Sequence, residues 1–434
     1  MRAAKARRWR RLKIAALWSG PGAWCLVQSS RVPQGGVVGL LGLFLLGDFY
    51  MQRRQFVSLV SGTVALAAAP VLMRSAQAQE AGLSAKSIAI ACSADVTGPL
   101  AAFGEDIRQG AGAALAQING RGGIHGRTLQ LNIMDDMYDP ARTVENIKQI
   151  LGQGNTFALL SCVGTANNKA ILSMTEEVGM VHVGPVTGAS SLRKGARSVF
   201  HVRASYTAEV HRLMQRLVEM NLKSIGVVYL DNPYGREMLE DTIHELDKNG
   251  ITLTVQAAVA TDSSNLSEVI SKVTAARPAA VLLATAGSAS VGIVRGLKKN
   301  LPGLLMTGIS STLMGDAPKQ LGEAASGIAL SLIVPNPFNT KTGVVRDYQA
   351  AMRAVGQPDF SPGSLDAYIN TRVLAEGLER AGPAVTQDKL RSALAGIRKW
   401  NLGDFVVDYS GPPPYVGSRF IDLGVLGSTG RFIG

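Results

Sequence analysis

Three loops of small and hydroxyl-bearing residues carry the chemistry that this sequence offers. They read TGPLAAFG from residue 97, CVGTANNK from residue 162 and GPVTGASSLR from residue 184. The last two are expected to run into helices, whose first turns present unpaired N–H groups and the positive end of the helix dipole. Two such helix starts, with the hydroxyls of Thr165 and Thr187, would form a receptor for a carboxylate. Alternatively, these side chains only cap their helices.

Catalytic and metal-binding patterns are missing from the sequence. It contains neither a G-x-x-x-x-G-K-[ST] phosphate loop nor a G-x-S-x-G nucleophile turn. The five histidines are scattered without an H-x-x-x-H pair, so we expect no metal and no cofactor. Asp135 and Asp136 end a predicted strand and should point to opposite faces, which suits capping better than acid–base catalysis. We therefore expect a binding protein and not an enzyme.

A repeated alternation of strand and helix must position the three loops. SIAIACSAD, from residue 87, is a continuous apolar strand of the kind buried on both faces. The helix that follows keeps its apolar residues on one face until glycines end it near residue 120. The alternation runs through one unit up to residue 204 and then through a second, comparable unit. This predicts an α/β fold with two doubly wound, Rossmann-like lobes, a hinge and a central cleft.

Residues 51–78 have the layout of an export signal. Arg53 and Arg54 precede an apolar run, and Ala76-Gln77-Ala78 provides a small-x-small cleavage site. The opening MQRRQF is similar to a twin-arginine signal. Cleavage after Ala78 is favoured over an uncleaved anchor. We therefore expect the mature protein in the periplasm.

Residues 1–50 are unusual because a signal should begin the chain. They combine a basic block with a glycine-broken apolar run. They are either a second anchor or sequence upstream of the true start, and Met51 favours the latter. Residues 1–78 hold eleven Lys/Arg and one acidic residue, so 79–434 carry only +2 of the net +12. The basic character therefore indicates no nucleic-acid partner.

Cys92 and Cys162 are the cysteines that remain after residue 78. Two cysteines are too few for a disulfide framework or a zinc set. Export would permit a bridge between them, but two buried thiols are the favoured interpretation.

The chain resembles the periplasmic solute-binding proteins of branched-chain amino acid ABC importers, which have the type I periplasmic binding fold. The resemblance spans residues 84–434 and rests on the stretches TGPLAAFGEDIRQGAGAALAQINGRGGIHGRTLQL, DDMYDP, GPVTGASS, YLDNPYG and GEAASGIALSLIVPNP. It implies two lobes that close over a small-molecule ligand and a closed form that a membrane permease recognises. We assign 79–204 plus 335–400 to lobe I and 205–334 plus 401–434 to lobe II. A monomer is expected.

The resemblance also implies where the ligand binds. Tyr234 would close down from lobe II, opposite a set of contacts in lobe I: Phe103, Val163, Gly164, Thr165, Val186, Thr187 and Gly188. Two positions depart from the family pattern. Ala286 lies where a second aromatic residue is usual, and Ser310 lies about where amino-acid binders place the acid that holds the ligand's ammonium group.

These departures shape the expected ligand. A buried ammonium group without a paired carboxylate is costly. The ligand is therefore expected to be a carboxylate or other small polar solute and not necessarily an α-amino acid. A ligand-sensing receptor of the same fold, coupled to a signalling partner, is the alternative function.

Overall fold

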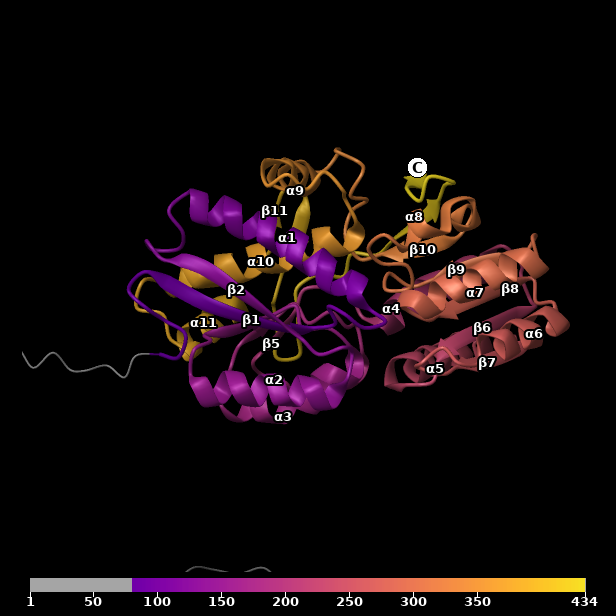
Figure 1. The fold of residues 1–434 in the computed structure, drawn as a ribbon, viewed down its shortest axis with the longest axis horizontal. Helices are drawn as coiled ribbons and strands as arrows, with labels where there is room; N and C mark the ends of the chain where they lie inside the picture. Colours follow the sequence, from indigo (N-terminus) through magenta and orange to yellow (C-terminus); the bar gives the residue numbers. More distant parts are fainter. Residues whose placement is uncertain (1–79, 434) are drawn as a thin grey trace, which may run out of the picture. The chain divides into compact units, whose positions relative to one another are not determined.

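Parallel strands alternate with helices in the computed structural model, which describes residues 80–433. The predicted signal at 51–78 and the stretch 1–50 lie outside the described residues. Figure 1 shows two sheets, each with helices on both faces. The predicted two-lobed α/β architecture is confirmed.

The sheet of lobe I has the strand order β13-β5-β4-β3-β1-β2, and all its pairings are parallel. Its strands are β1 (Ser87–Ala94), β2 (Thr128–Asp135), β3 (Ala158–Leu160), β4 (His182–Val183), β5 (Val199–His201) and β13 (Tyr415–Val416). Helices α1 and α10 pack on each other, as do α2 and α3. The helices of this lobe are α1 (Ala101–Gly120), α2 (Pro140–Gln153), α3 (Thr165–Glu177), α9 (Gly343–Ala354), α10 (Pro362–Ala381) and α11 (Gln387–Ala395), with a 3-10 turn η1 (Ser190–Leu192).

The sheet of lobe II has the order β15-β14-β10-β9-β8-β6-β7 and is parallel except for β14 and β15. Its strands are β6 (Ile225–Leu230), β7 (Val255–Val259), β8 (Ala280–Ala284), β9 (Leu305–Gly308), β10 (Ala329–Leu332), β14 (Asp422–Leu426) and β15 (Phe432–Ile433). Its helices are α4 (Tyr206–Glu219), α5 (Pro233–Asp247), α6 (Leu266–Ala276), α7 (Gly287–Asn300), α8 (Ala317–Leu321) and the 3-10 helix η2 (Gly322–Ala325). A separate hairpin joins β11 (Trp400–Leu402) to β12 (Phe405–Val407).

Local sequence explains the helix starts. Asp139 caps α2 by accepting a hydrogen bond from the backbone of Ala141, and Pro140 occupies the first helical position. Asn232 and Pro233 repeat this arrangement at α5. Ser361, followed by Pro362, caps α10. These polar caps place the helix N-termini next to the carboxyl ends of the strands.

The chain crosses between the two sheets three times: after β5, after β10 and after β13. The last crossing differs from the boundary assigned at residue 400. Tyr415 and Val416 pair in parallel with Phe200 and His201, so the chain stays with the first sheet until β13. Tyr415 also stacks on Phe200, with ring centroids 4.7 Å apart. This aromatic contact holds the segment in lobe I.

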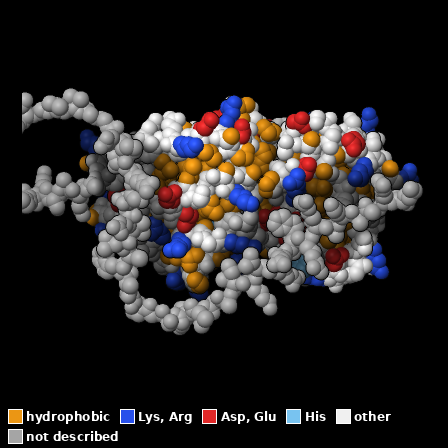
Figure 2. All heavy atoms as spheres, turned by 90° about the horizontal axis from the view of Figure 1, so that it is seen from below, with side chains coloured by type: hydrophobic (Ala, Val, Ile, Leu, Met, Phe, Trp, Pro, Cys, Tyr) orange, Lys and Arg blue, Asp and Glu red, His pale blue; other side chains and the backbone are white. Residues whose placement is uncertain are grey.

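The charge distribution agrees with the small net charge of residues 79–434. On the face shown in Figure 2, basic and acidic side chains are interspersed over the described part. Among residues 80–433, no helix is both long and apolar enough to cross a membrane.

Candidate ligand-binding site

Gly164, the residue before α3, cannot easily be replaced by another amino acid. Gly164 precedes the helix with φ of 96°, in the left-handed region. A Cβ added there would lie 2.7 Å from Cε2 of Tyr138 and 2.8 Å from Oδ1 of Asn167. Thr165 is therefore the first helical residue and not the cap, and its N–H group belongs to the unpaired first turn.

Two hydroxyls meet beside this helix start. Thr165 Oγ1 lies 2.8 Å from Thr187 Oγ1, and both side chains are buried. The loop after Thr187 forms only the short 3-10 turn η1 and not the predicted helix, because Thr187 Oγ1 accepts the N–H of Ala189 and turns the chain. The threonine pair therefore lies next to the N-terminus of one α-helix, α3, and not next to two helix N-termini as predicted.

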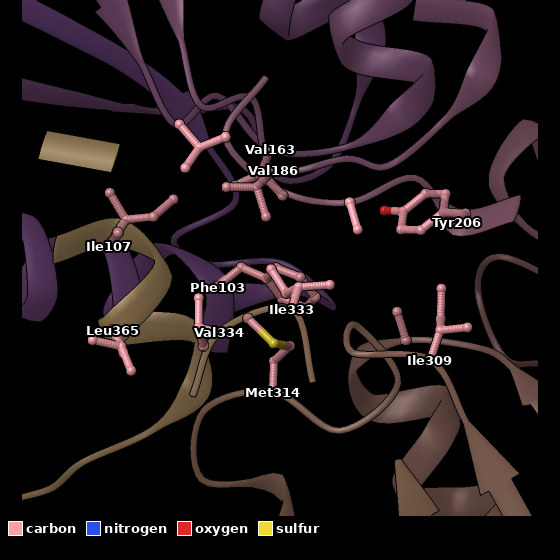
Figure 3. Packing of buried hydrophobic residues seen from close by; sticks show 14 of the residues in the cluster. Phe103, Ile107, Val163, Val186, Tyr206, Ile309, Met314, Ile333, Val334 and Leu365 are labelled. Carbon is pink, nitrogen blue, oxygen red and sulfur yellow. The ribbon is translucent and has the colours of Figure 1, made fainter. Parts of the chain in front are cut away.

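Buried apolar side chains from both lobes lie near one another between the lobes. Val163 and Val186 form a parallel bridge between their loops. Figure 3 shows these two valines and Phe103 on one side, with Met314 and Ile309 of lobe II on the other. All five are buried. The three lobe I residues are ones that the resemblance assigned to ligand contact.

A pair of tyrosines from lobe II lies against the Gly188 loop of lobe I. Tyr206 and Tyr234 make an edge-to-face contact with ring centroids 5.3 Å apart. Tyr234 OH lies 3.3 Å from the carbonyl of Thr285 and 3.2 Å from Ser311 Oγ. Tyr206 donates its backbone N–H to Gly188, and a Cβ on Gly188 would lie 2.6 Å from the Tyr206 ring. Gly188 thus allows the lobe I loop to reach the tyrosines.

Ser310 is held by two charged residues. Its Oγ accepts a hydrogen bond from Arg203 Nη2 at 2.9 Å, and its backbone N–H donates to Glu209 Oε2 at 2.8 Å. Ser331 Oγ also donates to Glu209 Oε2, at 2.6 Å. Arg203 Nη1 lies 3.9 Å from Asp366 Oδ2. Burial raises the pKa of Glu209 and of Asp366.

Arg203, Glu209 and Asp366 were not among the predicted site residues. Arg203 lies in the crossover after β5, Glu209 in the first turn of α4 and Asp366 in the first turn of α10. The sequence contains only a weak signal for these three residues. RASYTAE places a cation six residues before an acid at a lobe junction, and Asp366 falls on an otherwise buried helix face.

The remaining two predicted residues line cavities between the lobes. Phe103 lines a cavity of about 550 Å³ together with the start of α7, Met314–Gln320 and Asp359–Ser361. Ala286 lines a much smaller one, together with Leu100 and Tyr138. The larger volume lies within the range of small-molecule sites.

Several hydrogen bonds cross from lobe I to lobe II around these cavities. The N–H of Ser288 donates to the carbonyl of Pro99 at 3.2 Å. The N–H of Ser190 donates to Glu237 Oε1 at 2.6 Å. With the lobes in contact at these points, the predicted contact residues are buried.

Other candidate groups have structural roles. Asp136 is buried and accepts hydrogen bonds from Ser93 and Thr143, whereas Asp135 accepts from the loop at Val96 and Thr97. They face opposite ways, as predicted. Cys92 and Cys162 are buried free thiols. Within residues 80–433, no three His, Cys, Asp or Glu side chains are arranged to hold a metal.

Two α/β lobes joined by three crossovers, with binding loops at the facing strand ends, define a two-lobed binding protein. The model of the family described as periplasmic binding protein matches residues 87–412, and the chain belongs to this family. The family binds solutes and is not a family of enzymes, as predicted. Its members are exported to the periplasm.

Individual relatives agree with this assignment. The chain is 28% identical over 301 residues to Leu/Ile/Val-binding protein homolog 3 of Brucella melitensis, covering 68% of this chain and 79% of that protein. A substrate-binding periplasmic protein from Ralstonia solanacearum is 30% identical with a TM-score of 0.75, covering 80% of this chain and 99% of that one. An extracellular ligand-binding receptor from Verminephrobacter eiseniae is 26% identical with a TM-score of 0.73, covering 80% and 100%.

Proposed function

We propose that this protein captures a small organic carboxylate between its two lobes outside the cytoplasm and delivers it to an ABC import permease. One observation carries the proposal. The buried, paired hydroxyls of Thr165 and Thr187 lie at the start of α3, and Gly188, the next residue of that loop, accepts the N–H of Tyr206, whose ring contacts Tyr234 in lobe II. Helix N-termini and hydroxyls are donors that suit a carboxylate.

The proposed contacts are the ten residues named from the resemblance. Phe103, Val163 and Val186 would contact the ligand's apolar part, and Gly164, Thr165, Thr187 and Gly188 its carboxylate. Tyr234, Ala286 and Ser310 would close over it from lobe II. Binding would then shift the population toward the closed form.

A thermal-shift screen tests the proposal. The full chain is unfolded and refolded to remove carried ligand, and its melting temperature is measured with amino acids, carboxylates and amides. A ligand at 100 times its Kd adds about 2.7 kcal/mol of stability, which is readily seen. The proposal fails if no solute stabilises the protein.

The variant Thr165→Val tests whether the ligand binds at this threonine. It removes the hydroxyl while keeping the shape of a buried side chain, whereas a bulkier residue would overpack the cluster. We expect at least about tenfold weaker binding, equivalent to about 1.4 kcal/mol. Thr252→Val, at an exposed position, is the control. Unchanged affinity in Thr165→Val would refute the placement.

A further inference from the structure

Buried hydrogen-bond donors without partners lie next to Ser310 in the proposed site. The side chain of Arg203 is only 2% exposed, and its Nε and Nη1 have no hydrogen-bond partner. A guanidinium has five N–H donors and no acceptor. Only its Nη2 is engaged, by Ser310 Oγ. Buried donors of this kind are normally paired.

The nearby acids leave these donors unsatisfied. Asp366 Oδ2 is 3.9 Å from Nη1, which balances charge but exceeds hydrogen-bond length. Glu209 uses Oε2 for Ser310 N–H and Ser331 Oγ. Glu209 Oε1 has no hydrogen-bond partner. Burial raises the pKa of Glu209, and the nearby Ser310 hydroxyl lowers it by a smaller amount. The Ser310 hydroxyl can therefore donate a hydrogen bond to Glu209 Oε1.

Arg203 belongs to the same cluster as the proposed contacts. It donates to Ser310 Oγ, and the hydroxyl of the next residue, Ser311, lies 3.2 Å from Tyr234 OH. At the lobe I end, Thr165 and Thr187 stand at the positive end of α3. Both ends of the site therefore present hydrogen-bond donors.

From this arrangement we infer that the ligand carries a second oxygen acceptor, a further carboxylate or a keto group, that faces Arg203 and Ser310. The site is thus suited to dicarboxylic and oxo acids in preference to α-amino acids, because an ammonium group would bring more hydrogen-bond donors to a place where Arg203 already has unpaired ones. Arg203 is the residue that sets this specificity. The inference rests on the proposed function and specifies its ligand.

A matched series of five-carbon acids tests the inference by isothermal titration with the stripped full chain. Pentanoate has one carboxylate, glutarate adds a second, 2-oxopentanoate adds a keto oxygen and norvaline adds an ammonium group. We expect glutarate or 2-oxopentanoate to bind at least about tenfold more tightly than pentanoate and norvaline. Norvaline binding as tightly as the best oxygen-bearing acid would overturn the inference and point to Glu209 as an amine partner.

Two variants locate the effect. Arg203→Lys keeps the charge that balances Asp366 but loses the planar donor fork. Ser310→Ala removes only the hydroxyl. Each should weaken binding of the preferred acid by about tenfold or more beyond any loss that it causes for pentanoate. If Arg203→Lys misfolds, the result for Ser310→Ala decides. An equal loss of affinity for all four acids in either folded variant would contradict the inference.

Failure of the inference differs from failure of the proposed function. Tight binding of pentanoate or norvaline that Thr165→Val abolishes would leave the function standing and remove only the second-acceptor claim. Absence of binding by all four acids would overturn the inference, and the broader thermal-shift screen would then decide the function.

Discussion

Asp106 of α1 accepts a hydrogen bond from the backbone N–H of Gly315 at 3.0 Å, which ties lobe I to the loop before α8 in lobe II. The other carboxylate oxygen accepts the hydroxyl of Ser361, the cap of α10. Burial raises the pKa of Asp106 to about 7, against the lowering effect of these two bonds, and Glu105 and Asp316 add repulsion. A carboxyl group thus joins the lobes beside the larger cavity.

The stability of the protein should depend on pH through Asp106. The native state keeps this proton up to about pH 7, whereas the unfolded chain loses it near the ordinary value of 3.8. Between these values the native state binds more protons, so its stability falls as pH rises, by up to about 1.4 kcal/mol per unit. Above about pH 7 this contribution is lost.

Melting curves of wild type and Asp106→Asn between pH 4.5 and 8 measure the effect. Other buried carboxyls also titrate, so the quantity of interest is the difference between the two proteins. We expect the advantage of wild type to shrink as pH rises toward 7. Glu323→Gln, at an exposed position that is not among the charges acting on Asp106, should run parallel to wild type. Parallel curves for Asp106→Asn would contradict the assignment.

Gly164→Ala should destabilise the protein by about 1–3 kcal/mol, because the new Cβ meets Tyr138 and Asn167 and the backbone is left-handed. Denaturant midpoints measure this change. Gly112→Ala is the matched control. It lies inside α1 with nothing within 4 Å of the added carbon and should stabilise by about 0.5–1 kcal/mol. A neutral Gly164→Ala would show that α3 starts differently.

Tyr234→Phe should cost about 1 kcal/mol of stability, because it removes the hydroxyl contacts with Thr285 and Ser311 and retains the edge-to-face contact with Tyr206. We also expect weaker ligand binding in the thermal-shift assay. Tyr229→Phe, on a half-buried strand position of the same lobe, should change neither quantity. Equal effects of both variants would show that the hydroxyl of Tyr234 has no special role.

Cys92 and Cys162 should behave as two unreactive thiols in the native protein. Both are fully buried, so a thiol reagent should label neither before unfolding. After denaturation without reductant, both should react. Peptide mapping of the labelled protein distinguishes them from Cys25. A reductant-dependent mass change linking the two peptides would instead establish the disulfide that export permits.

Most elements could be predicted from sequence because their signals are local. The apolar run of β1, the one-sided helix α1, and Asp139 with Pro140 at α2 need only neighbouring residues to be recognised. The two-residue strand β13 could not be predicted in this way. Its place in the first sheet depends on pairing with Phe200, more than 200 residues earlier.

By itself, the sequence determined the alternation of strands and helices, the small-residue loops around Thr165 and Thr187 that are proposed to bind the ligand, and the lack of a catalytic motif. Only the tertiary structure decided the chemistry opposite those loops. Ser310 is held by Arg203 and Glu209, which lie 107 and 101 residues away in the chain. Hydrophobic periodicity records which face of an element is buried, whereas the pairing of single buried charges depends on how distant elements pack, and no local pattern encodes it.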